Sequence, residues 1–179
     1  NTIKGIMNIS QRMCNNRWLI NPQDHTDLIN RIENLLESPN APVFGEEVIS
    51  NKMPEPAIEA DSTAVISVSG ILAKDVSMDE EACLGLVDVE WISECLSNCA
   101  ADPYVKNIVL NFNSPGGETT GIEELGRKIK NIDEHIKPVF GWSDKMACSA
   151  AYWLISQCRM VGMIPSSQIA GIGVYSLVL

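Results

Sequence analysis

The chain has 179 residues, of which 45% are hydrophobic and 20% charged, and this composition predicts one main globular domain with an appendage. Its formal net charge is -10 and its 13 Lys and Arg residues are scattered, which argues against nucleic acid as a partner. The six cysteines show neither a Cys-x-x-Cys pair nor a zinc-like spacing with histidine, so we expect no metal ion, no cofactor and a reducing compartment.

The start of the chain predicts a helical arm. Asn21 and Pro22 form a helix start signal, and Trp18 precedes them. An apolar stripe at helical spacing follows, formed by Leu28, Ile29, Ile32, Leu35 and Leu36. We expect this amphipathic helix to dock on the core or on a neighbouring subunit, with Trp18 as its anchor.

Residues 39 to 61 contain four prolines with polar residues between them, a pattern that predicts an extended linker. We therefore divide the chain into a helical arm (1–38), a linker (39–61) and a main domain (62–179).

The main domain alternates predicted strands with predicted helices. Strands are expected at 64–70, 105–112 and 138–142. Helices are expected at 88–101, 118–136 and 149–158. This alternation predicts an α/β fold in which parallel strands are joined by right-handed crossovers.

A glycine turn follows the second of these strands, in the sequence Asn113-Ser114-Pro115-Gly116-Gly117. Adjacent glycines permit positive φ and let backbone amides approach a ligand, and the helix expected to follow adds its N-terminal partial positive charge. The segment therefore predicts a strand-to-helix turn suited to a developing oxyanion. On turn chemistry alone, a purely structural turn is the simpler interpretation.

The second motif lies about thirty residues later and contains Cys148, Ser149, Ala150 and Ala151 at the expected start of a helix. A serine there is a candidate nucleophile, because neighbouring amides can stabilise negative charge, and the small alanines allow close packing. The alternative is a helix cap. Cys148 is a rival nucleophile by residue type, although a small buried thiol is the simpler interpretation.

The order of these motifs resembles the signal peptide peptidase (protease IV) family of serine peptidases, and within it the phage and prophage head maturation proteases of the capsid protein C type. The resemblance runs from about residue 64 to residue 174. It implies a Clp/crotonase-like α/β fold built of repeated β-β-α and β-α units. It also implies Ser149 as nucleophile, with an oxyanion hole formed by the amides of Gly116, Gly117 and Ala150. The family's Gly-Ser-Ile-Gly-Val strand corresponds to residues 170–174, where Gly171 replaces the serine.

The general base does not match the family pattern within this chain. The resemblance implies a Ser-Lys dyad whose lysine lies beyond the position of residue 179, and no lysine follows Ser149 here. The expectation is therefore a domain truncated at its C-terminal side, without its base and inactive as it stands. Lys145 precedes the serine and does not match the family position. The related Clp peptidases use a histidine downstream of the serine, whereas His25 and His135 both come earlier.

For function, the resemblance implies a serine endopeptidase that processes phage or prophage capsid, scaffold or portal proteins and assembles as a homo-oligomer. The expected location is the bacterial cytoplasm, at the prohead in a phage setting. The sequence has no apolar stretch long enough to cross a membrane, so membrane association is expected only if an anchor precedes these residues. Three alternatives stay open: a bacterial signal-peptide-peptidase-type protease, a crotonase-like acyl-CoA enzyme and a non-catalytic assembly module.

Overall fold

The structure is a computed structural model that describes residues 17–20, 22–37, 55–59, 61–171 and 173. Most of the predicted linker therefore lies outside the described residues. The same holds for Ile172 and Val174 of the glycine-rich segment, and for the side chains of Leu35 and Leu36.

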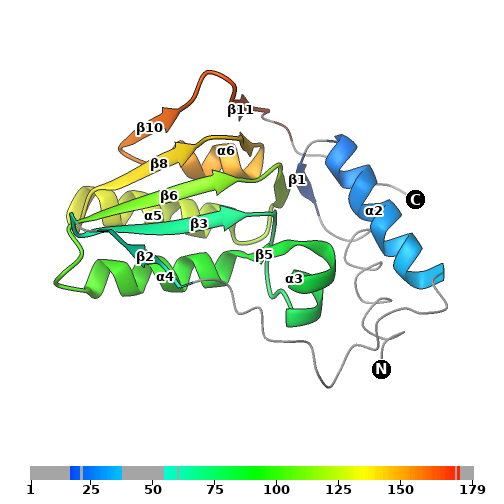
Figure 1. Ribbon diagram of the computed structural model, residues 1–179, viewed down its shortest axis with the longest axis horizontal. Helices are drawn as coiled ribbons and strands as arrows, with labels where there is room; N and C mark the ends of the chain where they lie inside the picture. Colours follow the sequence, from blue (N-terminus) through cyan, green and yellow to red (C-terminus); the bar gives the residue numbers. More distant parts are fainter. Residues whose placement is uncertain (1–16, 21, 38–54, 60, 172, 174–179) are drawn as a thin grey trace.

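A five-stranded sheet forms the centre of the fold. Its strands lie in the order β10 (Met160–Met163), β8 (Val139–Ser143), β6 (Asn107–Asn113), β3 (Thr63–Ser69) and β2 (Ala57–Ile58). The first four strands are mutually parallel, and β2 pairs antiparallel with β3 (Figure 1). Strand β2 lies within the predicted linker, where the alternation of the main domain gave no sign of it.

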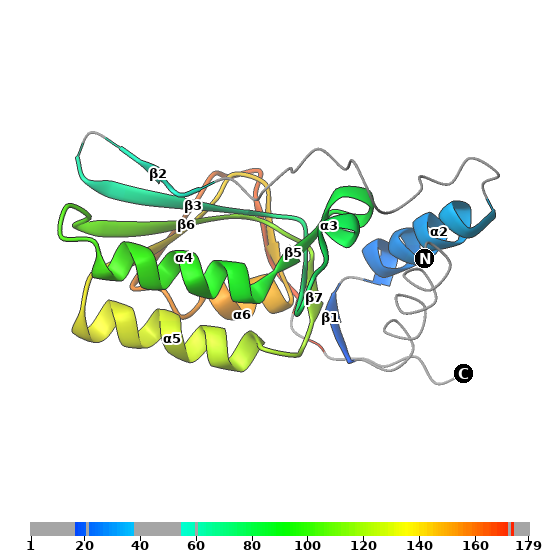
Figure 2. The same cartoon turned by 90° about the horizontal axis from the view of Figure 1, so that it is seen from below.

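Helices cover one face of this sheet (Figure 2). They are α4 (Val89–Ala101), α5 (Ile122–His135) and α6 (Ala150–Ile155). Alternate side chains of β6, among them Leu110 and Phe112, are fully buried in the core that these helices share with the sheet. The period of two along a strand explains this pattern, because successive side chains point to opposite faces.

The chain repeats a unit of a long strand, a short strand and a helix. After β6 come β7 (Gly116–Glu118) and α5, and after β8 come β9 (Met146–Cys148) and α6. The long strands of successive units lie side by side in parallel. The predicted α/β class, with repeated β-β-α units and a parallel sheet, is therefore confirmed.

One prediction about local structure is wrong. The helix expected to begin at Glu118 begins at Ile122, and residues 116–118 form strand β7 instead. The glycine turn therefore joins two strands and does not lie at a helix N-terminus. The physical reason is that β7 has ladder partners on both sides, β1 and β4, which a local sequence pattern cannot reveal.

These partners belong to a second sheet, which lies at the carboxyl ends of β3 and β6 (Figure 1). Its strand order is β1 (Trp18–Ile20), β7, β4 (Ile71–Ala73) and β5 (Leu86–Asp88). The pairing of β1 with β7 is antiparallel, so the arm contributes a strand beside the glycine turn.

The rest of the arm packs against this second sheet. Helix α2 (Pro22–Glu37) places Leu28 and Ile32 in a buried cluster with Trp18 and Ile20. Burying a large aliphatic side chain contributes about 1.5–3 kcal/mol, so Ile20, Leu28 and Ile32, together with Trp18, hold the arm firmly. The helix was expected to dock either on the core or on a neighbouring subunit, and in the structure it packs on its own chain. The short helix α3 (Met78–Leu84) completes the cluster through Leu84.

Candidate active site

The structure brings the two motifs together. The Ser114 N–H donates to the Met146 carbonyl (2.8 Å), and the Cys148 N–H donates to the Ser114 carbonyl (3.0 Å). Ser114 and Ala147 thus form a parallel bridge between the glycine turn and β9. The junction lies at the carboxyl ends of β6 and β8, the edge where ligands bind in open α/β sheets (Figure 1).

Ser149 occupies a strained position between β9 and α6. Its backbone has φ 58° and ψ -114°, and a non-glycine residue held in a sparsely populated region costs about 1–3 kcal/mol. The residue is buried, its N–H donates to the Ala170 carbonyl (3.1 Å), and its side chain makes no capping hydrogen bond. The structure therefore does not support the helix-cap alternative. A strained serine on a sharp strand-to-helix turn is the geometry of the nucleophile elbow.

Gly116 lies directly against this serine. Its φ is +108°, and a Cβ built on it would lie 2.9 Å from the Ser149 Cβ and 2.2 Å from the Leu19 carbonyl oxygen. A side chain at position 116 would therefore collide with both neighbours. The Gly116 N–H donates to the Ser114 hydroxyl (3.2 Å), so this amide already has a partner. To bind an oxyanion, this amide would have to share its hydrogen with the Ser114 hydroxyl or release that hydrogen bond.

The other two predicted oxyanion amides differ in their surroundings. Gly117 pairs with Leu19 on β1 and with Leu72 on β4, and a Cβ at this position would lie 1.8 Å from the Leu72 carbonyl oxygen. Ala150 is fully buried and is the first residue of α6, so its N–H has no acceptor within the helix. Of the predicted set, Gly116 and Ala150 adjoin Ser149 directly.

A pocket of about 360 Å³ opens beside Ser149. Leu19, Tyr152 and Trp153 form much of its wall, and Ser156 and Gln157 add polar groups. No charged residue lines it among the described residues. A mostly apolar hollow next to a candidate nucleophile suits the side chain of a bound peptide.

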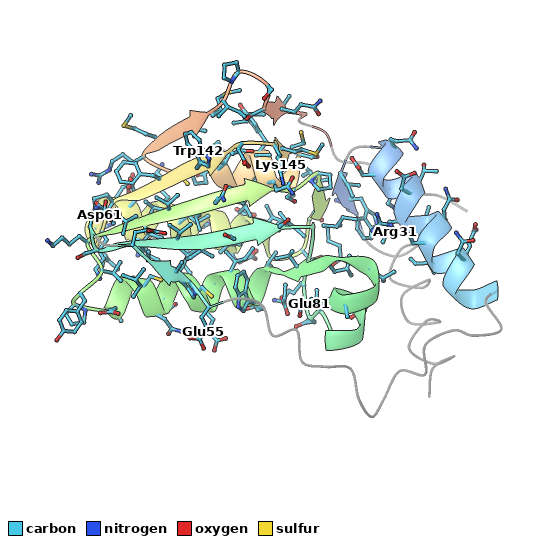
Figure 3. The ribbon with its side chains drawn as sticks, viewed as in Figure 1. Arg31, Glu55, Asp61, Glu81, Trp142 and Lys145 are labelled. Carbon is cyan, nitrogen blue, oxygen red and sulfur yellow. The ribbon has the colours of Figure 1, made fainter. Side chains whose placement is uncertain are left out.

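Lys145 and Cys148, the other residues weighed for the chemistry, are poorly placed for it. Lys145 lies at the opposite end of β9 from Ser149, and its side chain is exposed (Figure 3). Burial raises the pKa of the Cys148 thiol above its ordinary value, an effect opposed by a backbone hydrogen bond at Ala170. Because the thiolate is the reactive form, a raised pKa disfavours Cys148 as a nucleophile.

The histidines have structural roles. His135 is the last residue of α5, and its exposed ring contacts the Asn131 carbonyl at 3.1 Å, as expected for a residue at a helix end. His25 packs on Trp18, with ring centroids 5.1 Å apart, and burial lowers its pKa. Neither histidine lines the pocket beside Ser149.

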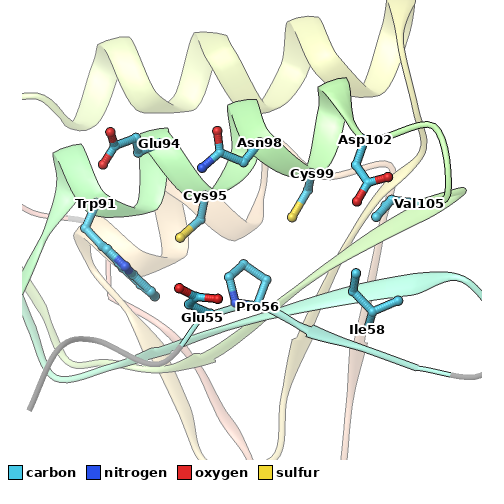
Figure 4. A pocket seen from close by; sticks show the side chains of 10 residues that line it. All are labelled: Glu55, Pro56, Ile58, Trp91, Glu94, Cys95, Asn98, Cys99, Asp102 and Val105. Atoms are coloured by element: carbon cyan, nitrogen blue, oxygen red, sulfur yellow. The ribbon is translucent and has the colours of Figure 1, made fainter.

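A larger pocket of about 450 Å³ lies elsewhere, between α4 and β2 (Figure 4). Trp91, Cys95 and Cys99 face it from the helix, and Ile58 faces it from the strand. Burial is the main cause that raises the pKa of Cys95 to about 11, and burial also raises that of Cys99, so both thiols stay protonated at neutral pH. None of the predicted site residues lines this pocket.

Among the residues that the structure describes, no group of three His, Cys, Asp or Glu residues is arranged to hold a metal ion. None of the described helices has the length and apolar character that crossing a bilayer requires.

Three elements of the site were not assigned by sequence reasoning. Leu19 reaches the pocket from the arm, the Ser114 hydroxyl braces the turn, and the Ala170 carbonyl holds the Ser149 N–H. Trp18, Leu19 and Ile20 are all apolar, so the sequence does not distinguish the side chain that faces the pocket. It gives no sign of which residues Leu19 meets.

Comparisons with known proteins agree with the motifs. The chain is 30% identical over 119 residues to Protease 4 of Salmonella typhi, covering 66% of this chain and 19% of that protein. It is 33% identical over 90 residues to the head-tail preconnector protein GP5 of Enterobacteria phage P21 (50% and 18%). It is 30% identical over 111 residues to the capsid assembly protease C of Escherichia phage lambda (62% and 25%). The expected resemblance is confirmed.

The chain thus spans between 18% and 25% of the length of these relatives. No protein-family model matches it. Among solved structures, it is similar to a crotonase from Legionella pneumophila, with 16% identity, coverage of 63% and 49%, and a TM-score of 0.46. It is also similar to a ClpP1 variant from Listeria monocytogenes, with 16% identity, coverage of 57% and 52%, and a TM-score of 0.39.

Proposed function

We propose that these residues form the nucleophile-bearing part of a serine endopeptidase, with Ser149 as the nucleophile. The observation that carries the proposal is the strained backbone of Ser149, held at the end of β9 against Gly116. Strain of this kind persists where the surrounding structure enforces it, and it clusters at active sites. Similarity to two proteins named as proteases supports the same reaction class.

The proposed mechanism proceeds through an acyl-enzyme. The Ser149 hydroxyl attacks the scissile carbonyl and gives its proton to a general base, which then protonates the leaving amine. The resemblance implies that this base is a lysine, and we propose that a segment following residue 179 supplies it. Such a lysine must be kept neutral by burial or by nearby positive charge.

The amides of Gly116, Gly117 and Ala150 are the proposed donors to the oxyanion, and Gly116 and Ala150 are the two that adjoin Ser149. The Gly116 amide would first have to release the Ser114 hydroxyl. Removal of one such donor costs about two to three orders of magnitude in rate. Water then hydrolyses the ester to Ser149 and releases the acid.

For the substrate, we propose capsid, scaffold or portal proteins of a phage or prophage, processed in the bacterial cytoplasm. The support is the pair of phage relatives, one named as a capsid assembly protease and one as a head-tail preconnector. A bacterial protease of the Protease 4 type is the second candidate, because that relative covers a larger share of this chain.

We also propose that the protein forms a homo-oligomer. Because Leu28 and Ile32 are buried in their own chain, the α2 stripe is not the expected contact. The edge strand β10 is the proposed contact between subunits, because it carries three exposed apolar side chains, those of Met160, Val161 and Met163.

Peptide hydrolysis by a form of the protein that extends beyond residue 179 to include the expected lysine tests the proposal. Ser149→Ala is expected to lower turnover by at least about four orders of magnitude, whereas the matched variant Cys148→Ala keeps it. The 179-residue chain alone is expected to show no turnover. Hydrolysis retained in Ser149→Ala would refute the assignment, and turnover by the 179-residue chain would refute a base outside it.

A further inference from the structure

The arm strand β1 reaches the candidate active site through one side chain. In the antiparallel register, Leu19 stands opposite Gly117 and Ile20 stands opposite Gly116. A Cβ built on Gly116 would have the Leu19 carbonyl oxygen as its nearest neighbour and the Ser149 Cβ as its next. Leu19, Gly116 and Ser149 therefore meet at one point.

The side chains of β1 divide between two regions. Trp18 and Ile20 belong to the buried cluster beneath α2, whereas Leu19 belongs to the main core. Leu19 is also the one described residue from the arm that lines the pocket beside Ser149. The period of two along a strand accounts for this division.

A strand paired beside an oxyanion turn could be either a removable mimic of substrate or a fixed wall. Removing β1 would expose Trp18 and Ile20, which are 1% and 3% exposed, and would separate them from Leu28 and Ile32. Exposing that much apolar surface is strongly unfavourable, so β1 stays in place while substrate binds. Leu19 is therefore a permanent part of the pocket.

We propose that Leu19 is a specificity-determining residue, which sets the size of the substrate side chain accepted beside the scissile bond. The inference rests on the proposed peptidase function of Ser149. The arm, which is remote in sequence from the motifs, would then control which peptides the site accepts. One methylene more or less in an apolar pocket changes discrimination by about 10- to 200-fold, so changes at Leu19 should be measurable.

Peptide binding to the 179-residue chain tests the proposal without requiring turnover. The probes are acetyl-Gly-Gly-X acids with X as alanine, leucine or phenylalanine, titrated by NMR, with the terminal carboxylate standing in for the acyl product. Leu19→Val enlarges the pocket by one methylene and is expected to raise the phenylalanine-to-leucine affinity ratio by about tenfold. Leu19→Ala should raise the ratio further. If Leu19→Ala does not fold, the comparison of wild type with Leu19→Val is sufficient.

Ile20→Val is the matched control, because it removes one methylene from the same strand but from the opposite face. It should leave the ratio unchanged. A ratio that is equal in wild type and Leu19→Val, or that shifts equally in Ile20→Val, overturns the inference, as does a wild-type chain that binds none of the three peptides. Failure of the peptidase function has a different signature, namely hydrolysis in the extended protein that does not depend on Ser149.

Discussion

Gly116 packs so closely against Ser149 that a Cβ added to the glycine would lie 2.9 Å from the Cβ of the serine. The contact joins two segments that the sequence separates by about thirty residues. Residue 116 must be glycine for two reasons: its φ is positive, and there is no room for a side chain. The integrity of the site can therefore be tested at Gly116 without touching the nucleophile.

Gly116→Ala is expected to destabilise the fold by at least about 2 kcal/mol, because a left-handed backbone strain adds to overpacking against Leu19 and Ser149. Thermal or urea denaturation measures the loss. The matched control is Gly85→Ala, since Gly85 also has positive φ (+67°) but nothing within 4 Å of its added Cβ. Gly85→Ala should lose only about 1 kcal/mol. Equal losses in the two variants would show that the contact with Ser149 is loose.

The Ser114 hydroxyl should prove necessary for the turn. It accepts the Gly116 N–H at 3.2 Å and lies 3.4 Å from the Gly116 carbonyl oxygen, to which it donates. Ser114→Ala leaves a buried amide without this partner, which costs about 1–3 kcal/mol. Hydrogen exchange at the Gly116 amide is expected to become faster by at least about tenfold. Unchanged exchange would mean that the hydroxyl does not hold this amide.

The arm should contribute to stability and not to assembly. Ile32→Ala removes a side chain that is 5% exposed, and a loss of about 2–5 kcal/mol is expected from denaturant unfolding. Asn30→Ala, at an exposed position of the same helix, is the control and should have little effect. Light scattering should give the same oligomeric state for both variants and wild type. An oligomer that dissociates in Ile32→Ala while the subunit stays folded would return the α2 stripe to the role of assembly contact.

Alkaline pH should destabilise the protein through Cys158. Burial, with a smaller contribution from Asp133, raises the pKa of this thiol from 9.0 to about 12. Between these values the unfolded thiol is ionised while the folded one keeps its proton, so the stabilising contribution is complete below pH 9 and is lost as pH rises toward 12. The slope for one such thiol is at most about 1.4 kcal/mol per pH unit.

Urea denaturation of wild type and Cys158→Ala at pH 9 and pH 11 isolates this effect, because other groups that titrate in the range are common to both proteins. Wild type should lose more free energy of unfolding than the variant over that interval. Parallel losses would contradict a thiol that stays protonated in the folded protein, partly buried against the core.

The sequence singled out Ser149, Gly116 and Ala150 because short motifs carry the resemblance, and the structure places these residues side by side, while their catalytic roles stay a prediction. The parallel α/β core was predicted correctly because strands and helices alternate with clear periodicity. The helix expected from Glu118 was wrong because Gly116 to Glu118 pair with β1 and β4, and such long-range pairing leaves no local pattern. Leu19 was missed for the same reason.

Mass spectrometry of the extended protein after reaction with a fluorophosphonate tests whether Ser149 is the nucleophile, because such reagents modify an activated serine. We expect a single phosphonyl group on Ser149, absent in Ser149→Ala and retained in Cys148→Ala. A label on another residue, or an unlabelled Ser149 in a protein that still hydrolyses peptides, would contradict it.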